Sequence, residues 1–325
     1  MKPVIALSIP TGIGANIGGY AGDFGYIARE FSKYFYTIVN PNAVNGGILS
    51  AINYDMAYLE GYLFDEFFKG DISITPKKQY ETNKIGIIFD CAIPKEILNV
   101  HYNTINALKM VQGIETIAIE HTQEPVGVKI EIKNGVSLGK LNNPNSILNA
   151  AQKLIQKGAQ AIAVVCFFGE DFEDENYSNG CGVDPIGGIE AVISHLIAKE
   201  FSLPVAHAPA FYDVDISLKL ENPKVASELI SSTYLPCVMQ GLSIAPKISQ
   251  NGTIKNADVE YLIVPYDALG SKAVLSSIEN DIKIITVKNK TVLNVDKDKL
   301  NITPYMQFES YEKCLKTLAK QEKEL

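Results

Sequence analysis

Apolar runs of strand length alternate with helical stretches along this chain, and that alternation constrains its fold more than any other feature. The runs cover residues 4–9, 85–89, 116–120, 161–168, 204–206, 261–264 and 282–287. Strands that are apolar on both faces are typical of parallel sheets covered by helices. The sequence therefore predicts an α/β fold with an open, largely parallel sheet flanked by helices.

Turn and cap signals refine this prediction. Helices are expected over residues 94–111 and 145–158, and Asn134-Gly135 predicts a tight antiparallel hairpin at the sheet edge. With 325 residues and no linker or repeat, the chain can form a single α/β unit. It can also form two lobes around a central cleft, with a soft boundary near 75–83 or 140–145.

Composition excludes several classes of protein. A net charge of −8 and the lack of any Lys or Arg block exclude nucleic acid and anionic membrane as main partners. No apolar run reaches the roughly 20 residues of a membrane span, and no signal peptide is recognisable, so a cytoplasmic location is expected. Five scattered cysteines without a C-x-x-C pair form neither a disulfide framework nor a zinc site. A symmetric homodimer is a common assembly for an acidic α/β protein of this size.

A glycine-rich run follows the first apolar run. Five glycines lie within residues 12–22, and glycine lets a ligand approach the backbone closely. The following helix would add its positive dipole end. We therefore expect an anion-binding loop made by residues from Thr11 to Asp23: Thr11, Gly12, Gly14, Asn16, Gly18, Gly19 and Asp23. The alternative is that the glycines only allow a helix to pack closely on a strand, with Asp23 as a helix cap.

The spacing of Gly12, Gly14 and Gly18 is one residue longer than the dinucleotide fingerprint. The expected second strand also ends in Asn40-Pro41-Asn42, without the carboxylate that would hold a ribose hydroxyl. A phosphate, carboxylate or nucleotide site is therefore favoured over NAD(P). Asn42 and Asn45 are candidates to line the same site, although Asn is also an ordinary turn residue.

A second part of the site is expected beyond residue 168, because ligands bind at the carboxyl ends of parallel strands. The acidic run 170–175 could hold a divalent cation such as Mg²⁺, or could be a solvated loop. Asp184 can cap a helix that starts at Pro185. That helix would present Gly187 and Gly188 to an anion.

Candidate catalytic residues follow from this placement. His207 is expected directly after a strand, where it could serve as general acid or base, or could simply hydrogen-bond the loop. Glu190 would share a helix face with Ser194. His195 lies next to Ser194 in an apolar helix, where a core histidine is more common than a catalytic one. Cys181 between glycines could be a nucleophile.

Several long motifs resemble an uncharacterised domain-of-unknown-function family found in cyanobacteria, plant plastids and some other bacteria. They comprise residues 9–15 and 17–23, Glu60-Gly61-Tyr62, residues 182–185, 190–196 and 206–210, and Leu235-Pro236-Cys237-Val238 with Gly241-Leu242-Ser243. The resemblance spans nearly the whole chain and implies no reaction. Members carry a Cys-Gly-Gly type loop where this chain has Leu269-Gly270-Ser271, and a residue other than Cys at position 181. The first departure suggests that this chain has its own substrate, and the second lowers Cys181 as a family nucleophile.

The sequence thus points to a small-molecule enzyme that binds an anionic substrate at the glycine-rich loop. Non-redox group transfer or lyase chemistry fits best, because the candidates supply donors for developing charge and a proton-transfer residue. Three alternatives stay open: an NAD(P)-dependent oxidoreductase, a Cys181-dependent hydrolase, and a metabolite-binding regulator without catalysis.

Overall fold

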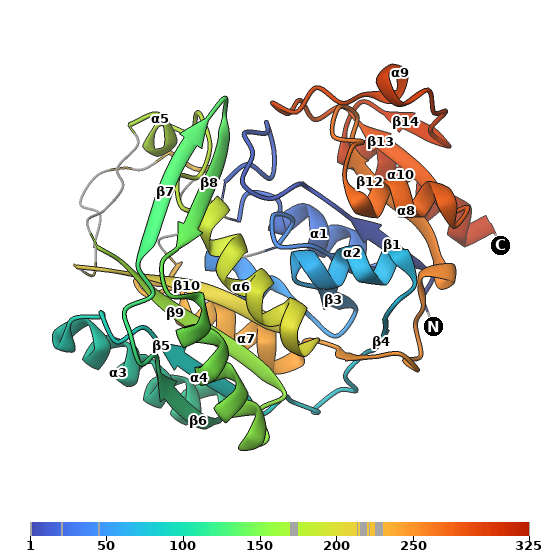
Figure 1. The fold of residues 1–325 in the computed structure, drawn as a ribbon. Helices are drawn as coiled ribbons and strands as arrows, with labels where there is room; N and C mark the ends of the chain where they lie inside the picture. Colours follow the sequence, from blue (N-terminus) through green and yellow to red (C-terminus); the bar gives the residue numbers. More distant parts are fainter. Residues whose placement is uncertain are drawn as a thin grey trace.

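A computed structural model describes residues 2–20, 22–44, 46–169, 175–212, 214, 220, 222–224 and 230–324. Its larger strands form two separate parallel sheets (Figure 1). The six-stranded sheet has the order β14-β13-β12-β1-β2-β3 and the four-stranded sheet the order β10-β9-β5-β6. Neighbouring strands run parallel throughout both sheets. The predicted α/β fold with parallel strands is therefore confirmed, but with two sheets in place of one.

The strands of the six-stranded sheet come from both ends of the chain. They are β1 (Val4–Leu7), β2 (Tyr36–Val39), β3 (Met56–Tyr58), β12 (Val259–Pro265), β13 (Lys283–Val287) and β14 (Met306–Phe308). The four-stranded sheet uses the middle: β5 (Ile85–Phe89), β6 (Thr116–His121), β9 (Ala161–Gly169) and β10 (Val205–Phe211). A small antiparallel pair, β4 (Ser73–Thr75) with β11 (Lys247–Ser249), lies where the chain passes between them. The boundary expected near 75–83 or 140–145 stays a prediction.

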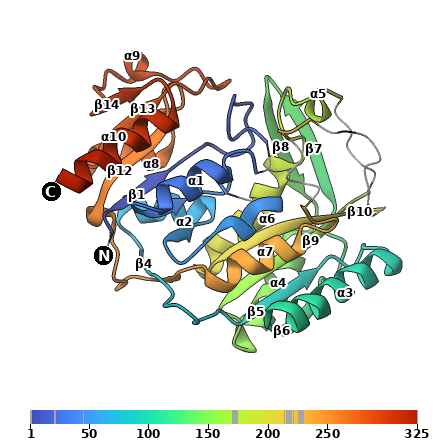
Figure 2. The same cartoon turned by 180° about the vertical axis from the view of Figure 1, so that it is seen from behind.

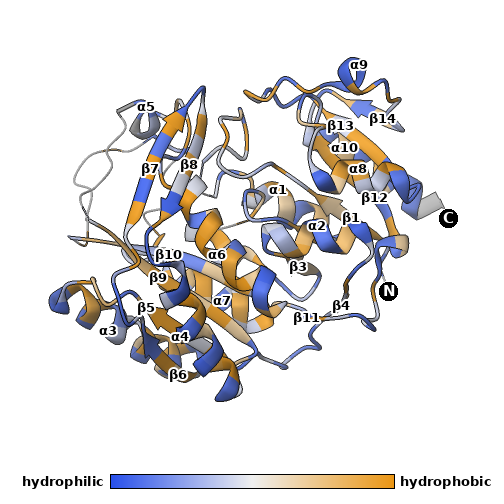
Figure 3. Cartoon of the chain, in the orientation of Figure 1, coloured by the Kyte–Doolittle hydropathy of each residue, from blue (hydrophilic) through white to orange (hydrophobic). Residues whose placement is uncertain are grey.

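Two apolar layers run through both sheets, because alternate strand residues point to opposite faces. Figure 2 shows one layer, where α1 (Gly25–Ser32) and α10 (Tyr311–Glu324) cover the first sheet and α3 (Lys95–Gln112) and α7 (Leu235–Ile244) cover the second. The other layer has α2 (Gly61–Lys69) and α8 (Lys272–Glu279) on the first sheet and α4 (Pro144–Gln156) and α6 (Gly187–Phe201) on the second (Figure 1). Shorter helical segments are η1 (Gly46–Ala51), α5 (Glu175–Ser178), η3 (Asn256–Asp258) and α9 (Lys297–Leu300). Apolar strands lie between more polar outer helix faces (Figure 3).

The predicted hairpin forms, but not at a sheet edge. Strands β7 (Val128–Lys133) and β8 (Val136–Leu141) pair only with each other among the described strands. Asn134 and Gly135 have φ values of 54° and 71°, as the two-residue turn requires. The hairpin packs on α6, where a Cβ at Gly139 would lie 2.4 Å from Cβ of Ile189. The edge position was therefore wrong because the hairpin covers a helix.

Strand β10 is longer than the sequence predicts. The expected strand ended at residue 206. The observed strand continues to Phe211, since β10 is an edge strand and a proline there need not break the hydrogen-bonded ladder. His207 consequently lies inside the strand and not beyond its carboxyl end, which corrects its expected placement.

Candidate functional site

The strongest constellation of predicted residues lies between α6 and β10. His207 and Glu190 have side chains only 2% and 9% exposed, and Nε2 of His207 is 3.4 Å from Oε2 of Glu190. On the other side of the ring, Nδ1 of His207 is 3.1 Å from Oγ of Ser194. Glu190 and Ser194 are one helical turn apart on α6, so a single helix face holds both ring nitrogens.

The serine contacts indicate where one proton sits. Oγ of Ser194 is 3.3 Å from the backbone oxygen of Glu190 and 3.4 Å from that of Ala191, so its hydrogen is directed back to the helix. Its oxygen then accepts from Nδ1–H of His207. A further proton can reside on Nε2 of His207 or on the carboxyl of Glu190. The pair is therefore arranged to hold and pass a proton.

Serine, histidine and glutamate in line also suggest a nucleophilic serine. Ser194 is completely buried and its hydroxyl hydrogen already bonds the helix. It positions the imidazole ring. The same geometry is also that of a satisfied core histidine, so activity must decide between the two roles.

Two buried residues that sequence reasoning did not select lie in this region. Tyr58 ends β3, and its hydroxyl has no hydrogen-bond partner among the described residues. Burial, together with the charges of Glu60 and Glu190, raises the pKa of Tyr58. Tyr58 therefore lies within electrostatic reach of both carboxyls. No sequence signal pointed to it, because β3 is too short to be recognised from the sequence.

Glu60 is the second of these residues. It caps α2 by accepting from the N–H of Tyr62 at 2.7 Å, and burial raises its pKa to about 8. Oε1 of Glu60 is 3.8 Å from Nδ1 of His195, whose pKa is lowered by burial and by Lys272 and Lys199. At neutral pH the acid is thus mostly protonated and the imidazole uncharged, so this contact is not an ion pair.

Predicted residues at the start of α6 are bonded within the protein. Oδ1 of Asp184 accepts from the N–H groups of Ile186 at 3.0 Å and Gly187 at 3.2 Å. α6 begins at Gly187 with Ile186 at its N-cap position, so the expected helix start at Pro185 with Asp184 as its cap is wrong, and Asp184 instead closes the turn that leads into the helix. The N–H of Gly188 donates to Oγ of Ser137 at 3.0 Å. A Cβ on Gly188 would lie 2.1 Å from the backbone oxygen of Ser137. These glycines let the hairpin reach the helix end, and their role toward an anion stays a prediction.

Several N–H groups of the glycine-rich loop are hydrogen-bonded within the protein. Gly14 donates to the oxygen of Gly135 at 3.0 Å, and Asn16 donates to the oxygen of Lys290 at 2.9 Å. The N–H of Ile17 donates to Asn289 at 3.0 Å, and that of Gly18 to Asp23 at 2.8 Å. These donors are not free for an anion in this structure. The loop, the hairpin turn at Gly135 and residues 289–290 approach one another closely, and this approach accounts for the glycines here.

Other predicted residues of the loop take several positions. Thr11 is half-buried and Asn16 exposed, while Gly12 and Gly19 are buried. A Cβ at Gly19 would lie 2.7 Å from the backbone of Ala15. Nδ2 of Asn42 donates to the oxygen of Pro10 at 2.5 Å, so it braces the loop. Asn45 lies outside the described residues.

Asp23 connects the loop to a distant segment. Burial raises its pKa to about 6, against the opposing influence of the Gly18 N–H and the Lys224 ammonium. Nζ of Lys224 lies 5.3 Å from the ring centre of Tyr20, and that ring stacks on Tyr177 at 5.2 Å. A cation therefore stands beside the glycine-rich loop. α1 begins only at Gly25, so Asp23 does not cap it.

The proposed metal and nucleophile sites receive no support from geometry. Across the described residues, no group of three or more His, Cys, Asp or Glu side chains could hold a metal ion. The acidic residues 170–174 lie outside them. Cys181 is exposed, whereas His207 is buried against Ser194 and Glu190.

The model of the family described as "Protein of unknown function (DUF3326)" matches residues 4–324. The chain belongs to this family. An uncharacterized lipoprotein of Synechococcus sp. is 36% identical to this DUF3326 chain over 300 residues, which cover 89% of the chain and 82% of the relative. The expected membership of an uncharacterised family with cyanobacterial members is confirmed.

No solved structure matches the chain. In the part of the chain that the structure describes, no helix has the length and apolar character to cross a membrane.

Proposed function

We propose that this DUF3326 protein is a small-molecule enzyme in which His207 and Glu190 transfer protons during non-redox group transfer or elimination. The observation that carries the proposal is the contact of 3.4 Å between Nε2 of His207 and Oε2 of Glu190. Burying two titratable groups is costly, and such arrangements concentrate at functional sites. Proton transfer by a positioned residue contributes about 10²–10⁴-fold to a rate.

Each residue has a distinct role in this proposal. Ser194 keeps Nδ1 of His207 protonated, which leaves Nε2 facing Glu190. Glu190 or His207 takes a proton from the substrate, and the pair returns it to the leaving group. Tyr58, on which the charge of Glu190 acts, and Glu60 beside Tyr58 supply neutral hydrogen-bond donors, since burial raises the pKa of each. Such donors stabilise charge that develops in a transition state.

Two lysines support an anionic substrate. Lys224 stands beside Tyr20 and Asp23 at the glycine-rich loop. Lys272 is close enough to His195 to help lower its pKa. A phosphate or carboxylate on the substrate would find attractive charge at either position. Asp184 and the glycines would act indirectly, by fixing the start of the helix that carries Glu190.

The first experiment is a thermal-shift screen against sugar phosphates, nucleotides, keto acids, amino acids and divalent cations. A compound that binds only the native protein raises Tm. Each hit is then incubated with the protein and followed by NMR for conversion. We expect His207→Gln and Glu190→Gln to bind the hit but to convert it at least ~100-fold more slowly. Glu200→Gln, an exposed change in the same helix, is the matched control.

Full turnover by His207→Gln would refute the proposed role. Binding without turnover, unchanged in His207→Gln, would favour a metabolite-binding regulator. A shift produced by NAD(P) alone would favour an oxidoreductase. Inactivation by iodoacetamide that is prevented by Cys181→Ser would favour a hydrolase.

We also propose a cytoplasmic location and a homodimer. The described cysteines are all unpaired thiols, as expected for a reducing compartment. The Synechococcus relative carries the name lipoprotein, so cell fractionation is the deciding test. Recovery of the native protein with membranes would overturn the location, and light scattering would measure the assembly.

A further inference from the structure

A cavity of about 340 Å³ opens at the start of α7. It lies on the other face of the four-stranded sheet from His207. Ala206 and Ala208 point into the apolar layer that contains α7, so His207 between them points away from it. The cavity is therefore separate from the proposed proton-transfer site.

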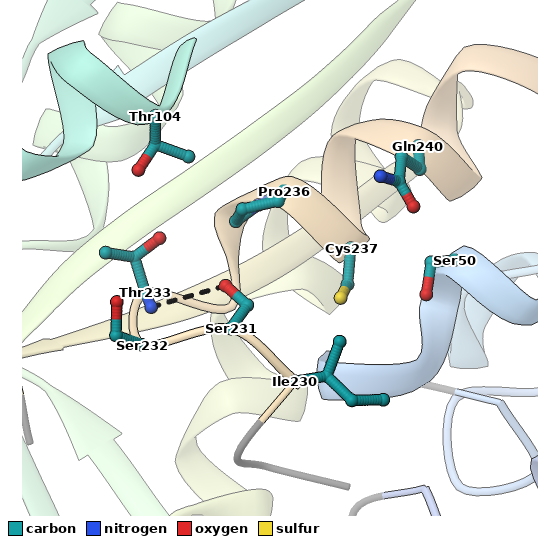
Figure 4. Close-up of a pocket in the computed structure, with 9 residues that line it drawn as sticks. All are labelled: Ser50, Thr104, Ile230, Ser231, Ser232, Thr233, Pro236, Cys237 and Gln240. Carbon is teal, nitrogen blue, oxygen red and sulfur yellow. Dashed lines mark hydrogen bonds between the residues drawn. The ribbon is translucent and has the colours of Figure 1, made fainter. Parts of the chain in front are cut away.

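Polar uncharged side chains dominate its lining. The nine residues that the structure describes around it carry no charged side chain: Ser50, Thr104, Ile230, Ser231, Ser232, Thr233, Pro236, Cys237 and Gln240. Figure 4 shows them gathered from η1, α3, α7 and the segment that precedes α7. Five hydroxyl groups and one amide can each donate and accept hydrogen bonds.

Thr233 singles this cavity out as a binding site. It is 4% exposed, and its Oγ1 has no hydrogen-bond partner among the described residues. In Figure 4 its hydroxyl points toward the space in front of Thr104 and Pro236. A buried hydroxyl without a partner is costly, so one is rarely kept without a ligand or water to satisfy it.

The start of α7 does not offer the donors of an anion site. The N–H of Leu235 already donates to the oxygen of Thr233 at 2.6 Å, and that of Cys237 to the oxygen of Tyr234 at 3.1 Å. Pro236 has no N–H. An anion would meet no free backbone donor from these positions, and no cation among the described lining residues. The chemistry of the cavity suits a neutral ligand that carries hydroxyl groups.

The packing of α7 builds the cavity wall from both sheets. A Cβ at Gly241 would lie 2.6 Å from the backbone oxygen of Leu49, so glycine allows α7 to lie directly against η1. This contact places Ser50 beside Cys237. Leu235 to Val238 and Gly241 belong to motifs singled out in the sequence, and the catalytic proposal leaves these motifs unexplained.

We propose that this cavity binds a neutral polyhydroxylated small molecule, of the size of a monosaccharide or cyclic polyol, through the hydroxyl groups of Thr233, Thr104 and the neighbouring serines. The bound molecule would contact η1, which connects β2 and β3 of the six-stranded sheet, and α3 and α7, which cover the four-stranded sheet. It would therefore stabilise their mutual packing.

The test measures binding of D-glucose, D-ribose and myo-inositol by saturation-transfer NMR and calorimetry, with inorganic phosphate as comparison. We expect at least one of the three neutral probes to bind. Thr233→Val should weaken that binding at least fivefold without lowering the Tm of the free protein, because it removes an unpartnered hydroxyl. Thr233→Ser keeps the hydroxyl and should bind as the native protein does.

Thr104→Phe provides a second variant, since a half-buried position on α3 can carry an aromatic ring into the cavity. It should abolish binding, whereas His207→Gln should leave it unchanged even if the proposed catalysis fails. Absence of binding by all three neutral probes would overturn the proposal. So would binding of phosphate alone, or binding that both Thr233→Val and Thr104→Phe leave intact.

Discussion

Nε2 of His207 lies 3.4 Å from Oε2 of Glu190, and these two side chains come from elements of different kinds, an edge strand and the first turn of a helix. Burial removes each of these groups from water, and this costs free energy unless the group finds a partner. Their mutual contact, and the Ser194 hydroxyl behind the ring, offset this loss. The relationship serves stability and proton transfer together.

The pair should show energetic coupling. In a double-mutant cycle of His207→Gln and Glu190→Gln, we expect an interaction of about 1–3 kcal/mol in the free energy of unfolding. Urea denaturation at neutral pH measures it. The exposed pair Glu312 and Lys316 on α10 provides the control and should show no coupling beyond error. Additive effects of the two substitutions would mean that the contact between His207 and Glu190 does not stabilise the fold.

Glu60 should make stability fall as pH rises. Its pKa is about 8 in the folded protein against an ordinary 4.5, so the folded state keeps a proton that the unfolded chain has lost. The contribution of Glu60 to the free energy of unfolding is fully present below about pH 4.5 and is lost progressively up to about pH 8. At 1.36 kcal/mol per pKa unit, the loss is at most about 5 kcal/mol.

Glu60→Gln should remove this part of the pH dependence, because the amide keeps an acceptor for the Tyr62 N–H and cannot ionise. Thermal unfolding between pH 5 and pH 9 measures the difference as a rising advantage of the variant. Glu115→Gln, at an exposed glutamate, should follow the native curve. Parallel curves for Glu60→Gln and the native protein would contradict the raised pKa.

His101 should act in the opposite pH range. Burial lowers its pKa to about 4, and its Nδ1 has no partner among the described residues. In the unfolded chain His101 binds a proton near pH 6.5, whereas in the folded protein it binds one only near pH 4. The free energy of unfolding therefore falls as the pH drops from about 6.5 to 4. The loss is about 3 kcal/mol at most. His101→Leu should abolish it, and urea titrations at pH 5 and pH 7 would show whether it does.

Local pattern was sufficient for most strands and helices and insufficient for their assembly. Apolar runs predicted β5 and β9 almost to the residue, and Asn134-Gly135 predicted the hairpin turn. The partition into two sheets depends on which strands pair over long sequence separations, as β1 does with β12. Short strands such as β3 have too few residues to show a pattern. The full length of β10 was missed because a proline within a strand is tolerated at a sheet edge, and the edge position of β10 is known only from the structure.

The candidate site was predictable in part for similar reasons. Glu190, Ser194 and His207 were recognisable by residue type, and the structure brings them together. Tyr58 escaped because a tyrosine in a short strand is an ordinary residue until its burial is known. Glu60 belongs to the motif Glu60-Gly61-Tyr62, but a glutamate before a helix gave no reason to choose it as a site residue until its burial was known. The glycines predicted a close approach at residues 12–19. They did not reveal that the hairpin and residues 289–292 are what approaches.

Gly188 provides the sharpest test of the close approach between the hairpin and the start of α6. An added Cβ would lie 2.1 Å from the backbone oxygen of Ser137 and 2.4 Å from its carbonyl carbon, and backbone atoms cannot yield as a flexible side chain can. Gly188→Ala should therefore lower the free energy of unfolding by about 2–4 kcal/mol through displacement of the hairpin from α6. Gly61→Ala at the start of α2, where nothing lies within 4 Å, should be neutral or stabilising by up to about 1 kcal/mol. Chemical denaturation of both variants compares the two sites, and equal stability would show that the hairpin does not press on the helix. Because Glu190 lies in the same turn of α6, Gly188→Ala should also weaken the coupling between Glu190 and His207, which the double-mutant cycle repeated in this background would measure.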